Sequence, residues 1–181
     1  MTSEVILLNG LSSHPWRHRE FLPHCRLWGC NSGYQYWPLH GVATMDSWAQ
    51  DDVIANYQGL RITGRRRQRD GFTSWPAPGV DSGSLLASYV LSNSENSVYC
   101  IGLDHHWEEK TQQGTGNAPL SRHGHQLWIR AWRDIIDHPR FFIVTDHDCT
   151  GQKIKTPQAE QLLLAKTANR INISTPIKDF P

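Results

Sequence analysis

The sequence lacks any long hydrophobic run. None of its apolar stretches approaches the ~20 residues that a membrane-crossing helix needs. The N-terminus, MTSEVILLNG, holds a short apolar run with no basic residue ahead of it, unlike a secretory signal peptide. We therefore expect no membrane span and no secretion through a signal peptide.

An excess of charge of one sign is also missing. Eighteen Lys and Arg residues face seventeen Asp and Glu residues, which leaves a formal net charge of +1. Such a balance creates no global field that would draw the protein to nucleic acid or to anionic lipid. The sequence therefore carries no strong nucleic-acid signal, and any contact of that kind must be local.

Cysteines are few, and none of them forms a CxxC pair. Two of the four cysteines, Cys30 and Cys100, stand inside apolar runs, where a thiol behaves as a small hydrophobic group. Reduced thiols are therefore expected rather than disulfides. By contrast the chain is rich in rings, with eight Trp and ten His, which can fill a core or stack on bases and sugars. Composition does not choose between these uses.

Short apolar runs alternate along the chain with turn signals and helix-like segments. With 38 % hydrophobic and 19 % charged residues, 181 residues suit one folded domain. We expect strands over 4–8, 26–30, 42–45, 60–63, 98–103 and 141–144, and helices over 48–57, 84–91, 128–136 and 158–168. This order predicts an α/β fold, a single Rossmann-like doubly wound domain with a mostly parallel sheet. Residues 1–146 would form the nucleotide-binding-like domain, and 147–181 a tail with a helix packed on it.

Ligands of such sheets bind outside the carboxyl ends of the strands, so the polar residues that follow each apolar run are the candidates. Asn9, Gly10 and Ser12 follow the first run, where backbone N–H groups can approach a phosphate or Ser12 can simply cap a helix. Asn31 ends the second run, where it can bind a base or ribose or cap a turn. Both alternatives stay open at each turn.

Two further candidates lie at helix starts and strand ends later in the chain. Asp81-Ser82-Gly83-Ser84 precedes a densely apolar helix, whose N-terminus suits a phosphate, although simple N-capping explains it too. Asp104-His105-His106 closes the strand over 98–103, with three ionisable groups in succession. Arg122-His123-Gly124-His125 stands just before the Trp128 helix, where an imidazole can act as a general base or as a helix cap.

The order of these pieces resembles a known family. The chain carries, in this order, an N-G-x-S turn, a C-N pair, an S-G helix start, a G-x-D strand end and a later His. In this order of motifs it resembles the bacterial sialyltransferases that use CMP-sialic acid, and short bacteriophage proteins with the same motifs. The resemblance spans residues 5–132. It implies a nucleotide or a CMP- or other nucleotide-sugar donor as ligand. It also implies that Asn9, Ser12, Asn31, Ser82 and Gly83 hold the cytidine nucleotide, with His123 or His125 as the base.

The sequence departs from the family pattern at two places. The first turn reads Leu8-Asn9-Gly10-Leu11-Ser12, without the Gly before Asn and the Pro before Ser. Where the family has tyrosines that bind the leaving phosphate, this chain has His105-His106-Trp107. Stabilisation of the leaving group would then come from His105 or from Arg122. We expect His125 to be the base, because it opens the helix whose apolar stripe carries Trp128 and Trp132.

Two other functions compete with this interpretation. Asp104-His105-His106 also matches the D-H-H tripeptide of the DHH phosphoesterases, which use Mn²⁺ or Mg²⁺. The side chains that would complete such a metal site are Asp46, His123, His125, Asp146 and Asp148. That family also needs an aspartate pair where this chain has Asn9-Gly10. A third possibility is a catalytically degenerate phage protein that binds a host or other phage structural proteins, or itself as a homo-oligomer. The expected location is the host cytoplasm, or the virion for a structural component.

A cluster of arginines, Arg65, Arg66, Arg67 and Arg69, lies in the polar segment 64–82. As part of a solvated loop it needs no function. As a lid over the strand ends it can clamp a phosphate.

Overall fold

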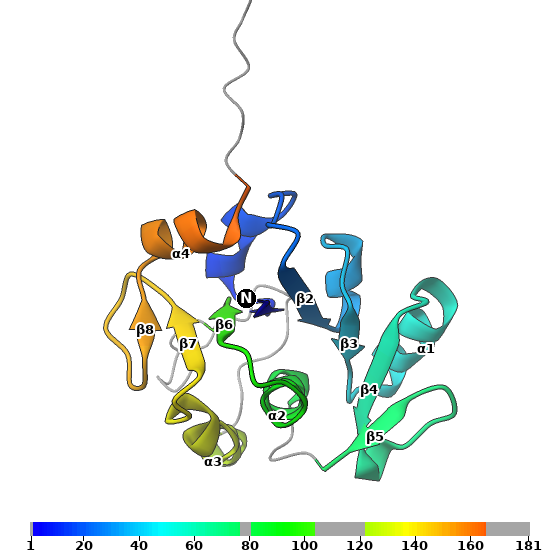
Figure 1. The fold of residues 1–181 in the computed structure, drawn as a ribbon. Coiled ribbons are helices and arrows are strands. Elements are labelled where there is room, and N and C mark those ends of the chain that lie inside the picture. The colour runs from blue at the N-terminus through cyan, green and yellow to red at the C-terminus, as the bar shows by residue number, and fades with distance from the viewer. Residues whose placement is uncertain (1, 77–80, 104–121, 166–181) are drawn as a thin grey trace, which may run out of the picture.

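Eight parallel strands form one continuous sheet in the computed structural model, which describes residues 2–76, 81–103 and 122–165 (Figure 1). The strand order is β5-β4-β3-β2-β1-β6-β7-β8. The strands are β1 (Ser3–Leu7), β2 (Cys25–Cys30), β3 (Gly41–Ala43), β4 (Leu60–Gly64), β5 (Thr73–Trp75), β6 (Val98–Ile101), β7 (Phe141–Val144) and β8 (Lys153–Ile154). The predicted α/β, Rossmann-like doubly wound domain is confirmed, and every strand pair is parallel.

Helices cover both faces of the sheet. One face carries α2 (Ser82–Asn93) and α3 (Arg122–Ile136), which lie next to each other (Figure 1). The other face carries α1 (Ser47–Asn56), α4 (Thr156–Leu163) and the 3-10 turn η1 (Leu11–Trp16). A second 3-10 turn, η2 (Asn31–Gln35), links β2 to β3, and a third, η3 (Arg65–Arg67), links β4 to β5.

Side chains of the central strand alternate between two apolar cores. Ile6 and Leu8 pack under α2 and α3, whereas Val5 and Leu7 pack on the face of α1 and α4. A strand that is buried on both faces needs the continuous apolar run that predicted it. On α3 the predicted stripe is buried in full: Trp128, Ala131, Trp132, Ile135 and Ile136.

Some predicted boundaries were wrong. The segment 64–82 is not only a loop, because it contains η3 and the edge strand β5. The two-residue strand β8 falls in the predicted tail. Helix α3 begins at Arg122, so the predicted base candidates lie within its first turn rather than before it. Residues 104–121, which follow the strand predicted over 98–103, and the end of the last predicted helix lie outside the described residues. No helix of the described part is both long and apolar enough to cross a membrane.

Candidate functional site

The carboxyl ends of the parallel strands meet at one edge of the sheet, which we call the carboxyl edge. Strands β2 to β5 lie on one side of β1 in the sheet, and β6 to β8 lie on the other side. The topological switch point is therefore between β1 and β6. Leu7 of β1 pairs with Gly29 of β2 and with Ile101 of β6. The residues that follow these three positions therefore stand at the place where doubly wound sheets bind their ligands.

Two asparagines lie in register at this edge. Leu7 pairs with Gly29, so Asn9 and Asn31 each stand two residues beyond that pair. Both are half-buried. The Asn9 side chain makes no hydrogen bond within the part of the chain that the structure describes, and that of Asn31 makes one, at 3.5 Å. The two amides therefore keep unused donors and acceptors at neighbouring strand ends.

The backbone at Asn31 is left-handed, with φ +48°. This region costs an ordinary residue about 1–2 kcal/mol, and asparagine tolerates it better than most. The turn η2 starts at this residue directly after β2. Asparagine thus suits this turn conformation, which accounts for part of its presence independently of any ligand.

The first residue of α2 ties two strand ends together. The Ser82 hydroxyl accepts a hydrogen bond from the Met45 backbone N–H at 3.0 Å and donates one to Asn31 Oδ1 at 3.5 Å. Met45 follows β3, so Ser82 links the ends of β2 and β3. With the Ser82 side chain almost fully buried, its geometry points to positioning of Asn31 rather than to direct ligand contact.

Asp81 caps α2. One carboxylate oxygen accepts the Ser84 backbone N–H at 2.8 Å, and the other accepts the Ser84 hydroxyl at 2.7 Å. Burial raises the pKa of Asp81, while the hydrogen bonds from Ser84 and from the Gly83 backbone oppose that shift. The carboxylate thus takes first-turn N–H groups that could otherwise hold a phosphate, as the capping alternative expects.

The buried Asp81 also affects its neighbour Cys30. Burial in the core, together with the charge of Asp81, raises the pKa of the Cys30 thiol far above its usual range. A thiol of this kind stays protonated near neutral pH and is a poor nucleophile. Cys30 is therefore a core residue, as the sequence predicts.

Two glycines at the edge are explained by close packing. A Cβ atom on Gly83 would lie 3.0 Å from both Trp132 Cζ2 and Asp81 Oδ1. Gly102 follows β6 with φ +86°, and a Cβ there would lie 2.6 Å from the Leu8 carbonyl oxygen. These glycines let α2 approach α3 and let the turn after β6 approach β1. Neither contact requires a ligand.

The first turn differs in detail from the expected phosphate loop. Ser12 is exposed, whereas the neighbouring Ser13 is buried and donates its hydroxyl to the Gly10 carbonyl at 2.8 Å. Gly10 is buried and has an ordinary φ of −64°. The chain needs no left-handed glycine there, and the six-residue 3-10 helix η1 follows it.

The candidate base belongs to the first turn of α3. Helix α3 joins the parallel strands β6 and β7, so it runs back across the sheet and begins at the carboxyl edge. Arg122, His123 and His125 all lie in this first turn. Their helical backbone is described, while Asp104 and His105 lie outside the described residues.

Thr44 is a polar residue at this edge that the sequence interpretation missed. Cys30 pairs with Ala43, so Thr44 stands beside Asn31 in the same row. Thr44 is fully buried, and its hydroxyl oxygen has no hydrogen-bond partner within the described part of the chain. Buried hydroxyls without partners are rare in folded proteins. The only signal in the sequence was a threonine at the end of an apolar run.

The described residues do not assemble the metal site of the phosphoesterase alternative. Within 2–76, 81–103 and 122–165, no three His, Cys, Asp or Glu side chains are grouped to hold a metal ion. Asp146 accepts the Thr156 backbone N–H at 3.1 Å, and Asp148 pairs with Lys153 at 2.5 Å. Asp46 is exposed and makes no side-chain hydrogen bond at the start of α1.

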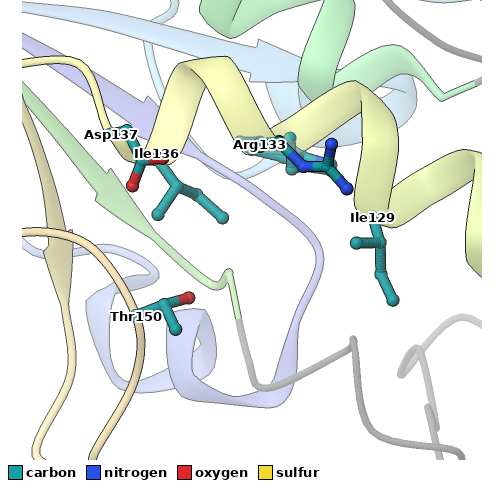
Figure 2. A pocket seen from close by; sticks show the side chains of 6 residues that line it. Ile129, Arg133, Ile136, Asp137 and Thr150 are labelled. Atoms are coloured by element: carbon teal, nitrogen blue, oxygen red, sulfur yellow. The ribbon is translucent and has the colours of Figure 1, made fainter.

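Two cavities lie away from these residues. One of about 260 Å³ separates α3 from the loop between β7 and β8, where Ile129, Ile136 and Thr150 contribute to its wall (Figure 2). The other, of about 410 Å³, lies where β2 and β3 begin, beside His24 and His40. None of the predicted site residues lines either cavity. The candidate site at the strand ends therefore lies outside both of these cavities.

Comparison of the chain with protein-family models, with curated proteins and with solved structures found no match. Its function therefore has to be inferred from its own residues.

Proposed function

We propose that the carboxyl edge binds a pyrimidine nucleotide or nucleotide sugar, as the resemblance to the CMP-sialic-acid-dependent sialyltransferases implies. The observation that carries this proposal is the pair of half-buried amides, Asn9 and Asn31, at adjacent strand ends. An amide side chain both donates and accepts hydrogen bonds, which matches the mixed edge of a pyrimidine base. A polar ligand would also offer a partner to the buried hydroxyl of Thr44.

The remaining predicted contacts have indirect roles in this proposal. Ser82 holds Asn31 in place through its hydroxyl, and Gly83 lets the start of α2 pack against Trp132. Asp81 places a carboxylate at the start of α2, which disfavours a second anion there. The phosphate is therefore assigned to the cationic first turn of α3, where Arg122 lies.

Glycosyl transfer is the reaction that we propose for this site. A neutral imidazole suits removal of a proton from the acceptor hydroxyl near pH 7. His125 stands three and seven residues before the buried Trp128 and Trp132, and His123 is the second candidate. A cation at Arg122 or His105 would stabilise the departing phosphate. The start of α3 at the carboxyl edge supports this assignment.

Calorimetric titration with CMP, CDP, UMP and UDP tests the binding proposal. We expect saturable binding of at least one of them, and a loss of about 5- to 10-fold in affinity for Asn31→Ala or Asn9→Ala, the value of one or two hydrogen bonds. Asn93→Ala is the matched control, because Asn93 is exposed near the last turn of α2. If the folded protein bound none of the four nucleotides, the proposal would be overturned and a catalytically degenerate phage component would be favoured.

Turnover is tested separately. His125→Ala should abolish transfer or donor hydrolysis while nucleotide affinity stays within a few-fold, because the base contacts the acceptor. Unchanged turnover in His125→Ala and in His123→Ala would contradict the catalytic assignment but leave nucleotide binding standing.

A further inference from the structure

Trp48 is the most exposed of the described tryptophans. It is the second residue of α1 and is 62 % exposed. Five of its counterparts are buried: Trp16, Trp28, Trp37, Trp128 and Trp132. An indole that contributes little to the core carries a solvation cost in the folded protein, and it presents a flat ring to whatever approaches this end of the sheet.

The arginine turn η3 is fastened to the same helix. Buried Gln50 donates its amide N–H groups to Thr63 Oγ1 at 2.8 Å and to the Arg67 carbonyl at 3.0 Å. Arg69 pairs with Asp51 of α1 at 2.5 Å. Helix α1 lies beside β4 and β5 at one end of the sheet (Figure 1). The Gln50 contacts hold η3 against the first turn of α1, the turn to which Trp48 belongs. Asp51, the partner of Arg69, stands three residues after Trp48 and therefore on the same exposed side of the helix.

Within the part of the chain that the structure describes, the three arginines of η3 have no acidic partner. Arg65, Arg66 and Arg67 are all exposed, and none forms an ion pair within the described residues. Of the nearby carboxylates, Asp51 is taken by Arg69, and Asp52 accepts the Tyr34 hydroxyl at 2.7 Å. The turn therefore presents three guanidinium groups that form no ion pair with a described residue.

The shape of η3 favours an extended anion over a single phosphate. A 3-10 turn has three residues per turn, so consecutive side chains point about 120° apart. Because their side chains leave the turn in different directions, Arg65, Arg66 and Arg67 suit successive phosphates of a chain better than one phosphate group. A stacking ring beside spread cations is the arrangement by which proteins bind single-stranded nucleic acid.

We propose that Trp48 and the arginines of η3 form a binding surface for single-stranded nucleic acid. Trp48 stacks on an unpaired base, while Arg65, Arg66 and Arg67 contact the backbone phosphates. A duplex hides its bases, so it offers Trp48 nothing to stack on. The surface is local, which agrees with the near-neutral charge of the whole chain. It lies at the same carboxyl edge as the asparagine pair, because η3 follows β4 and α1 follows β3, but it shares no residue with the proposed nucleotide site.

Fluorescence anisotropy of a labelled oligothymidylate tests this surface, with salt varied from about 50 to 200 mM. Trp48→Ala should weaken binding by about 5- to 100-fold and leave the salt dependence unchanged, because stacking involves no counterion. Replacing all three arginines of η3 by Ala should reduce the slope of log K against log salt by about 2, which is ~0.7 for each lost phosphate contact. Arg130→Ala, at an exposed position of α3, is the matched control and should change neither value.

Three results would overturn the proposal. They are absence of binding at low salt, equal affinity for duplex DNA or polyphosphate, and unchanged affinity in Trp48→Ala. Asn31→Ala should bind the oligonucleotide like the wild-type protein. Failure of this surface and failure of the nucleotide site are thereby distinguished.

Discussion

Ser82 Oγ lies 3.5 Å from Asn31 Oδ1, so the first residue of α2 contacts the residue that follows β2. The same hydroxyl accepts the Met45 N–H. Through this one side chain, the start of a buried helix fixes the ends of two neighbouring strands. The proposed ligand site depends on that arrangement.

Ser82→Ala should therefore weaken both the fold and the site. Loss of the bond to Met45 should lower the free energy of unfolding by about 1 kcal/mol. Release of Asn31 should also lower nucleotide affinity. Urea denaturation and calorimetry measure the two effects, and Ser92→Ala on the exposed side of α2 is the control. A variant with unchanged stability would show that the Ser82 hydroxyl does not fix these strand ends.

The stability of the protein should depend on Asp81 in a defined pH window. Burial raises the pKa of Asp81 in the folded state, so the folded protein holds this proton more tightly than the unfolded chain. The favourable contribution is complete below the unfolded pKa of about 4 and is lost as the pH rises through the folded pKa. Asp81→Asn, which can still cap the helix, should remove this decline in urea denaturation between pH 4 and neutrality.

Asp148→Asn serves as the control for that measurement. Lys153 lowers the pKa of the exposed Asp148. Any change in stability caused by titration of Asp148 therefore occurs at a lower pH than the window predicted for Asp81. An identical decline in Asp81→Asn and wild type would show that another group causes it.

A buried carboxylate at the opposite edge should matter more for stability than any surface ion pair. Glu4 of β1 is fully buried and accepts hydrogen bonds from Trp28 Nε1 at 2.6 Å, Ser94 Oγ at 2.9 Å and Asn96 Nδ2 at 3.0 Å. Glu4→Ala would leave these donors without a partner and should cost about 3–5 kcal/mol.

Glu160→Ala gives the comparison. It breaks the exposed pair with Arg19 and should cost about 0–1 kcal/mol. Equal losses in the two variants, measured by urea denaturation, would mean that the Glu4 network contributes no more than a surface contact.

The cysteines should react in two classes. Cys25 and Cys149 are half-buried, whereas Cys30 and Cys100 are buried. Burial raises the pKa of Cys25 and of Cys149, so their reaction with a thiol reagent should be slow at neutral pH and faster at higher pH. Two equivalents should react in the folded protein and four after denaturation. More than two in the folded state would contradict the packing of Cys30 or Cys100.

Much of the fold could be predicted because the central strands are mostly apolar and are buried on both faces. The runs that became β1, β2, β6 and β7 carry this signal, and so does the stripe of α3. The edge strands β5 and β8 could not be predicted, since they have two or three residues and polar neighbours. Their pairing depends on contacts with β4 and β7 that the local sequence does not show.

The candidate site could be predicted in position but not in detail. Polar residues after apolar runs located Asn9 and Asn31 at the carboxyl edge. Capping of α2 by Asp81 was one of the two alternatives that the sequence left open. The sequence did not show that the Ser82 hydroxyl reaches Met45, because that contact joins segments that are distant in sequence. Trp48 was assigned only to a helix, and its exposure follows from how α1 lies on the sheet.

The most direct test of the nucleotide proposal is an NMR titration of the ¹⁵N-labelled protein with CMP. We predict that the side-chain NH₂ signals of Asn9 and Asn31 shift saturably, together with the backbone amide of Asn31, while the NH₂ signal of Asn93 stays in place. No shift at either asparagine, or shifts confined to the other edge of the sheet around His24 and His40, would contradict the proposal that this carboxyl edge recognises a nucleotide.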